Sequence, residues 1–171
     1  IRYNPTYGKK QPFLEDKSGN IWLPGLDGII YIFNKAANKL DSIDISKGGP
    51  KIIYTSLLQD KEGVVWVGTE NGFAKIILAG GNNSAAQVKW FYNNSNDRNS
   101  LNYNLVSCFL EDPQAPEKYI WIATKGGGLN RLDKATGNFF HLTIKDGLPD
   151  DVVYGILTDE AGNIWGSTNK G

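Results

Sequence analysis

The segment Asp60–Trp66 reads DKEGVVW, and near copies of it stand at Asp16–Trp22 (DKSGNIW) and Asp159–Trp165 (DEAGNIW). Aligning the chain on the Asp and the Trp adds a fourth copy, Asp112–Trp121, in which three extra residues lie within PQAPEK. A second insertion of eight residues is expected within 79–87, a stretch rich in Gly, Asn, Ser and Ala. Without these insertions the repeat has a strict period of 44 residues, which is typical of propeller blades.

Each copy predicts the same four short antiparallel strands. An apolar run precedes the Asp, and Asp at the first and Gly at the fourth position of the following turn favour a type I hairpin turn with a bulge. The second strand carries the Trp, and two further strands with alternating β-branched and aromatic residues follow. The sequence therefore predicts an all-β fold of four-stranded β-propeller blades, in a partial array of about three and a half.

The predicted blade boundaries follow from these strands. The blades are expected at 12–45, 52–93, 105–144 and, incomplete, 152–171, as part of a larger propeller. The fourth strands of the three complete blades are predicted at Lys39–Ile45, Val88–Tyr92 and Asn138–Ile144. No helix is predicted anywhere.

The repeated residues are interpreted as structural. Each Trp is expected to pack against the next blade, because an indole buries about 200 Å² of surface. The alternative for the tryptophans is a ladder that stacks on sugars. The structural repeat residues are Asp16, Gly19, Trp22, Asp60, Gly63, Trp66, Asp112, Trp121, Asp159, Gly162 and Trp165.

The composition excludes several classes of function. Eighteen basic and eighteen acidic residues cancel without a basic stripe, which argues against a nucleic-acid partner and against direct membrane contact. The longest apolar runs, such as Ile29–Phe33, are far short of the roughly 20 residues that span a bilayer. The single cysteine, Cys108, rules out an internal disulfide and a cysteine metal cluster, and it is predicted to be a buried small residue. There is no Met, so the chain is expected to be a mature or excised segment.

Little in the chain suggests catalysis. The one histidine, His141, is predicted on an outer strand beside Phe139 and Phe140, and no metal-binding motif is present. Calcium at the Asp16 turn is not expected, because the loop supplies a single carboxylate. We predict no catalytic residue, no metal and no cofactor.

The best copies resemble a known family. Ser100–Asp133 (SLNYNLVSCFLEDPQAPEKYIWIATKGGGLNRLD) and 146–168 (DGLPDDVVYGILTDEAGNIWGST) look like the two-component regulator propeller repeat. The first copy departs from it with Leu-Pro-Gly at 23–25, and the second with Phe-Ala-Lys after Gly72.

This resemblance implies an extracytoplasmic, periplasmic sensor region of a Bacteroides-type hybrid two-component histidine kinase that recognises oligosaccharides. In such receptors the propellers hold seven or so blades, and a β-sandwich domain, a membrane helix and the kinase follow. The chain is then expected to be a fragment, with Ile1–Tyr3 finishing the outer strand of a preceding blade. Its partners would be the rest of the propeller and sensor. The open ends of the array predict a homodimer or aggregation.

The candidate ligand site lies on the face opposite the Asp turns. There the turns Leu26–Gly28, Glu70–Gly72 and Lys125–Gly127 meet the connectors Ser46–Lys51, Asn93–Asn104 and Lys145–Asp151. Amides, an Arg and aromatic rings suit a carbohydrate, and Arg98 also suits an acidic sugar. An ordinary cluster of solvated turn residues is the alternative. The predicted ligand-binding residues are Trp90, Tyr92, Arg98, Asn102, Tyr103 and Lys125.

Three functions remain in competition. The first is a ligand-sensing segment that binds rather than catalyses. The second is a propeller scaffold for protein–protein interaction or dimerisation. The third is an enzyme like the streptogramin lyases, which are propellers with similar repeats and need a histidine-centred site.

Overall fold

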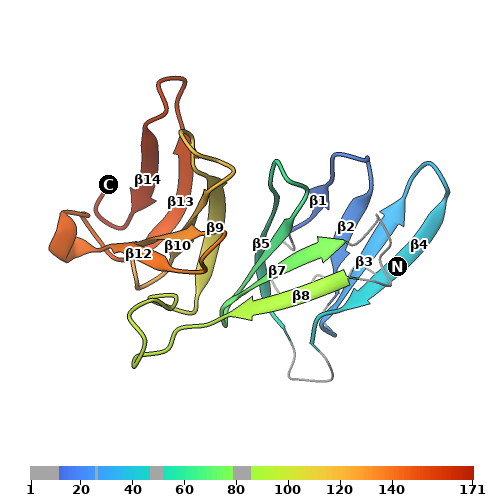
Figure 1. The fold of residues 1–171 in the computed structure, drawn as a ribbon, viewed down its shortest axis with the longest axis horizontal. Coiled ribbons are helices and arrows are strands. Elements are labelled where there is room, and N and C mark those ends of the chain that lie inside the picture. Colours follow the sequence, from blue (N-terminus) through green and yellow to red (C-terminus); the bar gives the residue numbers. More distant parts are fainter. Residues whose placement is uncertain (1–11, 26, 47–51, 79–85) are drawn as a thin grey trace.

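The computed structural model describes residues 12–25, 27–46, 52–78 and 86–171 and shows three four-stranded antiparallel sheets followed by a two-stranded one (Figure 1). Each sheet follows chain order, so every connection inside a sheet is a hairpin. The predicted all-β fold of about three and a half propeller blades is confirmed. The strands are β1 (Leu14–Glu15), β2 (Ile21–Pro24), β3 (Ile29–Asn34), β4 (Lys39–Asp44), β5 (Tyr54–Gln59), β6 (Val65–Thr69), β7 (Phe73–Leu78), β8 (Ala86–Phe91), β9 (Val106–Glu111), β10 (Tyr119–Thr124), β11 (Leu129–Asp133), β12 (Phe139–Leu142), β13 (Val153–Thr158) and β14 (Ile164–Thr168).

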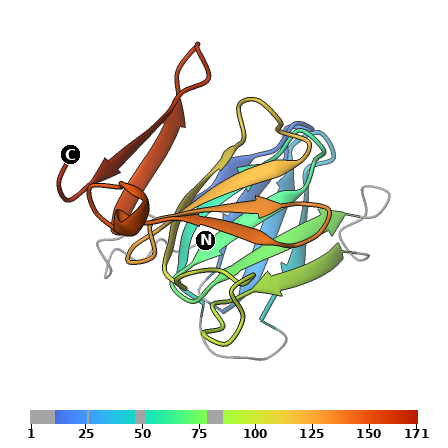
Figure 2. The same cartoon turned by 60° about the vertical axis from the view of Figure 1, so that its left-hand side comes forward.

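The sheets stand side by side as blades 1 to 4. Their first strands are neighbours, since β1 contacts β5, β5 contacts β9 and β9 contacts β13 (Figure 2). First strands that follow one another in this way line the axis of a propeller, and the fourth strands lie at its rim.

The repeated Asp makes two kinds of hydrogen bond in each blade. In blade 2, Oδ1 of Asp60 accepts the backbone N–H of Val64 at 2.9 Å, and Oδ2 accepts the indole N–H of Trp66 at 2.8 Å. The Gly at the fourth turn position has a positive φ, 84° at Gly63, which a side chain would strain. The indole bond recurs in the other blades at 2.8–2.9 Å, from Trp22 to Asp16, Trp121 to Asp112 and Trp165 to Asp159. In all four blades this bond holds the Trp in one orientation relative to its hairpin turn.

The tryptophans form the joints between blades. Trp22 is fully buried in a core that includes Val65 and Ile76 of blade 2, and Trp66 in a core that includes Ile120 of blade 3. Trp121 packs in the same way with Val153 of blade 4. Trp165 presents the same face to solvent and is 61% exposed.

Polar contacts tie neighbouring blades together at the Asp turns. The backbone N–H of Lys17 donates to Gln59 Oε1 at 2.7 Å, and that of Lys61 donates to Glu111 Oε1 at 2.8 Å. Lys134, whose side chain is 9% exposed, reaches from blade 3 to Asp60 Oδ2 at 2.9 Å, where it pairs with a fully buried carboxylate. Burial acts to raise the pKa of Asp60, but the Trp66 and Lys134 contacts outweigh it and lower the pKa below its ordinary value.

Some predicted boundaries were wrong. The strand predicted at Asn138–Ile144 covers only Phe139–Leu142, because Thr143 caps a short 3-10 helix at Ile144–Asp146. Thr143 Oγ1 and the Asp146 carboxylate bond each other's backbone, and this capping box ends the strand. The expectations for Ile1–Tyr3, for Leu26, for 47–51 and for the insertion at 79–85 concern residues outside those that the structure describes.

Candidate functional site

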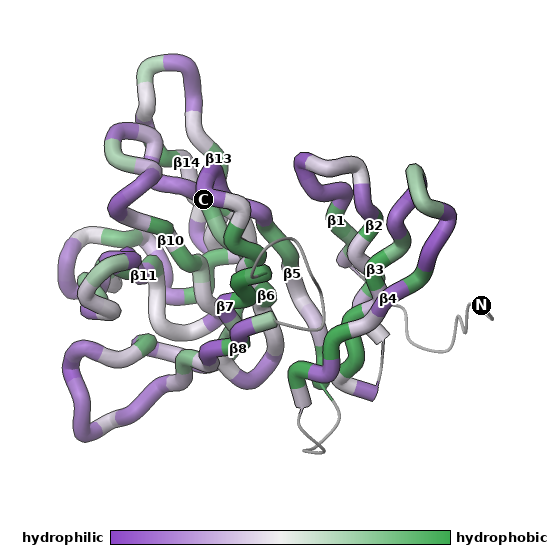
Figure 3. The backbone as a smooth tube through the Cα atoms, turned by 45° about the vertical axis from the view of Figure 1, so that its right-hand side comes forward, coloured by the Kyte–Doolittle hydropathy of each residue, from purple (hydrophilic) through white to green (hydrophobic). Residues whose placement is uncertain are grey.

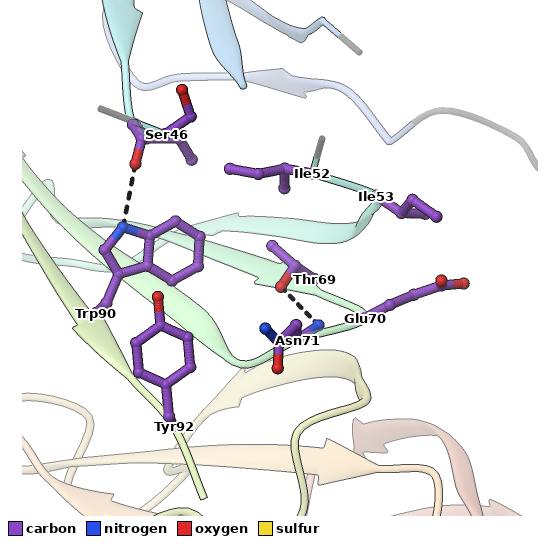
Figure 4. A pocket seen from close by; sticks show the side chains of 9 residues that line it. Ser46, Ile52, Ile53, Thr69, Glu70, Asn71, Trp90 and Tyr92 are labelled. Carbon is purple, nitrogen blue, oxygen red and sulfur yellow. Dashed lines mark hydrogen bonds between the residues drawn. The ribbon is translucent and has the colours of Figure 1, made fainter. Parts of the chain in front are cut away.

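A pocket of about 310 Å³ opens between blades 1 and 2, at the end of the sheets opposite the Asp turns (Figure 4). It gathers residues from four places: the end of β4, the start of β5, the β6–β7 turn and the end of β8. Its volume lies at the small end of the range for ligand sites. The lining residues are Ile45, Ser46, Ile52, Ile53, Thr69, Glu70, Asn71, Trp90 and Tyr92.

One wall of the pocket is aromatic. Trp90 and Tyr92 lie two positions apart at the end of β8, so both point to the same side of the strand. Their rings stack with centroids 5.6 Å apart and an interplanar angle of 8°. The indole N–H of Trp90 donates to the carbonyl of Ile45 at 3.1 Å and thereby joins the two blades. Tyr92 remains 46% exposed, and partial burial raises the pKa of its hydroxyl.

The opposite wall is a tight polar turn. Thr69 Oγ1 donates to the carbonyl of Gly72 at 2.8 Å and accepts the N–H of Asn71 at 3.0 Å. The N–H of Glu70 donates to the carbonyl of Ile53 at 3.0 Å, which holds the turn against the start of β5. With its backbone bonded in this way, the turn projects the exposed Asn71 amide at the pocket mouth (Figure 4).

Gly72 lets the two walls meet. Its φ is +85°, and a Cβ there would lie 2.4 Å from the carbonyl oxygen of Phe91 and 2.7 Å from Cδ1 of Tyr92. Any side chain at this position would push the Tyr92 ring away from the turn. The glycine of the repeat therefore shapes the pocket as well as the hairpin.

The structure brings together two of the six predicted ligand-binding residues, Trp90 and Tyr92. Asn102 instead donates from Nδ2 to the carbonyl of Gly127 at 3.0 Å, so it fastens the loop to blade 3. Tyr103 lies against that same turn, where a Cβ on Gly127 would come within 2.6 Å of its Cβ.

The two predicted cations lie away from the pocket lining. Lys125 Nζ sits 5.3 Å from the centre of the Tyr154 ring, which is on blade 4. Arg98 is exposed in the segment between β8 and β9. The amide-rich loop on which the prediction rested uses its own side chains for its turns, as when Asp97 Oδ1 accepts the N–H of Asn99 at 2.9 Å.

Sequence reasoning missed the apolar part of the lining, namely Ile45, Ile52 and Ile53. One feature of the sequence points to two of them. Ile45 and Ile52 flank the connector Ser46–Lys51, which is expected on the same face as the turn Glu70–Gly72. The contact between Ile45 and Trp90 joins residues 45 positions apart, which no local pattern indicates.

The titratable residues that could do chemistry are otherwise engaged. His141 Nε2 lies 2.9 Å from the carbonyl oxygen of Ser100, and the ring stacks on Phe139. Cys108 is half-buried, and burial raises the pKa of its thiol. Among the described residues, no three His, Cys, Asp or Glu side chains come together in a way that could hold a metal ion.

Solved structures with the same fold include three that cover most of this chain. The extracellular domain of a hybrid two component system from B. thetaiotaomicron shares 22% identity with a TM-score of 0.71, over 91% of this chain and 21% of that one. PorZ, a surface component of the type-IX secretion system of Porphyromonas gingivalis, shares 16% with a TM-score of 0.67, over 93% and 24%. An inactive virginiamycin B lyase from Staphylococcus aureus with quinupristin shares 13% with a TM-score of 0.65, over 90% and 47%. The chain thus spans less than half of each of these structures.

These likenesses and the blade geometry define the class of protein: a β-propeller segment. The particular repeats are identified by sequence, because the model of the two component regulator propeller family matches residues 48–71 and 147–170. Two stretches of the chain thus match the repeat of this family. No curated protein matches its sequence. The described residues hold no helix of the length and hydrophobicity needed to cross a bilayer.

Proposed function

We propose that this chain is a ligand-binding segment in the periplasmic sensor region of a hybrid two-component receptor, and that it takes an oligosaccharide. The observation that supports this most directly is the pocket between blades 1 and 2. It joins two stacked rings, three isoleucines and a polar turn in one small hollow.

The chemistry of the pocket suits a sugar. A pyranose ring offers an apolar face that packs on aromatic side chains and a rim of hydroxyls that need hydrogen-bond partners. Tyr92 supplies both a ring face and a hydroxyl, and the Asn71 amide both donates and accepts. Since the Trp90 N–H is already bonded to Ile45, the indole contributes its apolar surface.

The position of the pocket offers a route to signalling. Its lining comes from two blades that share the Trp90–Ile45 hydrogen bond, so a bound ligand bridges the joint. A ligand that prefers one angle between the blades shifts the population toward that angle. The kinase of the proposed receptor lies outside these 171 residues.

Binding is favoured over catalysis. A lyase-like reaction needs a histidine-centred site, and the only histidine of the chain is His141, held between Ser100 and Phe139. The described residues that line the pocket include one carboxylate, Glu70, and no His or Cys. These features support a sensor that releases its ligand unchanged.

The test is a thermal-shift screen of the chain against oligosaccharides of varied linkage and charge. At a hundredfold excess over Kd, binding adds about 2.7 kcal/mol of stability, which corresponds to a rise of roughly 5–10 °C for a domain of this size. Tyr92→Ala is expected to abolish the shift. Tyr103→Ala is the matched control, because Tyr103 is also 46% exposed but lies outside the pocket lining, and it should keep the shift.

The second candidate function is a scaffold for protein–protein interaction or dimerisation. The exposed apolar side chains of the terminal blades favour it, including Leu40 at 51% and Trp165 at 61% exposure. The absence of any shift across a broad panel, together with self-association, would support this function over sensing.

A further inference from the structure

The fourth strands of blades 2 and 3 contact the connector before them in the same way. In blade 2 the indole N–H of Trp90 donates to the carbonyl of Ile45 at 3.1 Å. In blade 3, Nε2 of His141 lies 2.9 Å from the carbonyl oxygen of Ser100. Trp90 and His141 also hold the same place in the strand register, one position beyond the row of the repeat Trp. The joint between blades 2 and 3 is therefore the counterpart of the joint that holds the pocket.

The turns beside these strands match as well. Thr69 Oγ1 accepts the N–H of Asn71 at 3.0 Å, and Thr124 Oγ1 accepts the N–H of Gly127 at 3.1 Å. Gly127 therefore stands where Asn71 lines the pocket. Both joints lie inside the array, with a blade on either side.

The chain itself fills the corresponding space between blades 2 and 3. The connector Asn93–Asn104, which Figure 3 shows as a largely hydrophilic loop after β8, supplies the filling residues. Nδ2 of Asn102 donates to the carbonyl of Gly127 at 3.0 Å. The backbone N–H of Asn102 donates at 2.9 Å to Oδ1 of Asn130, which is fully buried. An amide group is thus bonded to this turn.

A six-membered ring lies beside the amide. A Cβ on Gly126 would come 3.0–3.2 Å from three carbons of the Tyr103 ring, so the ring rests on the backbone of the turn. The filled joint shows what such a space accepts: an amide that donates to the turn carbonyl, and a ring next to it.

The pocket between blades 1 and 2 offers the same acceptor. The carbonyl of Asn71 takes the place of the Gly127 carbonyl, and among the described residues no hydrogen bond uses it. Ile52 and Ile53 add aliphatic surface to the lining (Figure 4). A group that suits both features carries an amide N–H and a methyl.

Given the proposed function, on which this step rests, we propose that the pocket recognises its oligosaccharide through an acetamido group, as on a 2-acetamido-2-deoxyhexose. The acetamido N–H donates to the Asn71 carbonyl, as Nδ2 of Asn102 donates to Gly127. The methyl packs on the aliphatic lining at Ile53, and the pyranose ring packs on the exposed face of Tyr92.

This arrangement discriminates between sugars. A hexose with a hydroxyl in place of the acetamido group lacks both the amide and the methyl, and one hydrogen bond with one buried methyl is worth roughly 10-fold in affinity. A deacetylated amino sugar keeps the nitrogen as a cation but lacks the methyl, so it should bind no better than the hexose.

Isothermal titration of the chain with matched disaccharides tests this preference. N,N′-diacetylchitobiose is compared with cellobiose, and N-acetyllactosamine with lactose, because the members of each pair differ only in their acetamido groups. The acetylated member of at least one pair should bind about 10-fold more tightly than its partner. Chitobiose without acetyl groups should not share the gain.

Two variants place the preference in the pocket. Ile53→Ser removes part of the surface that receives the methyl, so it should bring the affinity for the acetylated sugar closer to that for its partner. Ile77→Ser is the matched control, because Ile77 is 39% exposed and Ile53 40%, but Ile77 lies outside the lining. The control should keep the full preference.

The outcomes separate this assignment from the proposed function. Equal affinity within both pairs, while the sugars still bind, would overturn the acetamido group and leave the sensor function standing. A preference for the deacetylated sugar, or one that survives Ile53→Ser unchanged, would overturn it too. If no oligosaccharide binds, the proposed function fails and the acetamido assignment fails with it.

Discussion

Replacing Trp66 and Trp165 by Ala separates the packing of the repeat Trp from its hydrogen bond. Both indoles donate to the Asp of their own turn at 2.8 Å, so both variants lose the same bond. Trp66 is fully buried, whereas Trp165 is 61% exposed. Any difference between the two variants therefore reports burial between blades.

The magnitudes follow from the surface removed from water. About 200 Å² of buried indole at roughly 25 cal/mol per Å² gives about 5 kcal/mol gross, and truncations of buried Trp cost about 3–5 kcal/mol in measured series. Less than half of the Trp165 surface is covered, so the same arithmetic gives about 2 kcal/mol or less. We expect a loss of about 3–5 kcal/mol for Trp66→Ala and about 1 kcal/mol for Trp165→Ala.

The assay is equilibrium unfolding in urea, followed by far-ultraviolet circular dichroism because the substitutions remove fluorescent groups. The comparison uses dilute protein, so that self-association does not contribute, and it requires a common m value. A loss below about 1 kcal/mol for Trp66→Ala, or equal losses for both variants, would refute the role of the Trp as a joint between blades.

Three more predictions concern the Asp turns and the pocket. Lys134→Met should lower the free energy of unfolding by about 3–5 kcal/mol, because it leaves the buried Asp60 carboxylate without its cation. Lys35→Met removes an exposed ion pair with Glu15 and should cost about 1 kcal/mol or less. Thermal unfolding of the two variants makes the comparison. The pKa of Asp60 lies below its ordinary value, because its hydrogen bonds and Lys134 outweigh burial, so stability should be fully present above about pH 4 and fall as acid protonates the group. Unfolding curves from pH 7 to pH 2 test this, and a flatter fall is expected in Asp60→Asn. Gly72→Ala should destabilise the chain more than Gly19→Ala, because both have positive φ but only the Cβ at position 72 would meet a backbone carbonyl, at 2.4 Å; a smaller loss at position 72 would contradict the close contact.

The candidate site was only partly predictable, and its residues show why. Trp90 and Tyr92 were found because aromatic residues at the end of a strand and before a polar loop stand out in the sequence. Asn102 looked equally suitable, but its amide is bonded to the carbonyl of Gly127, 25 residues away. Lys125 likewise faces Tyr154 of blade 4. Whether a polar side chain is available to a ligand depends on its contacts with residues far away in the sequence.

The hydrogen bond between the repeat Asp and Trp was predicted only in part. The sequence shows a spacing of six residues between them, but the third blade, with a spacing of nine, keeps the bond at 2.8 Å. The sequence indicated the recurrence, and the structure supplied its cause: the hairpin returns the second strand so that the indole meets the carboxylate. In blade 3, where PQAPEK lengthens the turn, Asp112 still accepts both a backbone N–H and the indole N–H of Trp121.

The sequence by itself determined the all-β fold, the repeat of 44 residues and the turn chemistry, because strand alternation and the Asp–Gly turn act over a few neighbouring residues. It also marked each repeat Trp as a packing residue. Only the tertiary structure decided which side chains line the pocket between blades 1 and 2, and which carboxylate Lys134 would pair with. Those contacts join different blades, about one repeat apart or more, as Trp90 and Ile45 do across 45 positions. They depend on how the finished sheets stack, which local residue patterns do not encode.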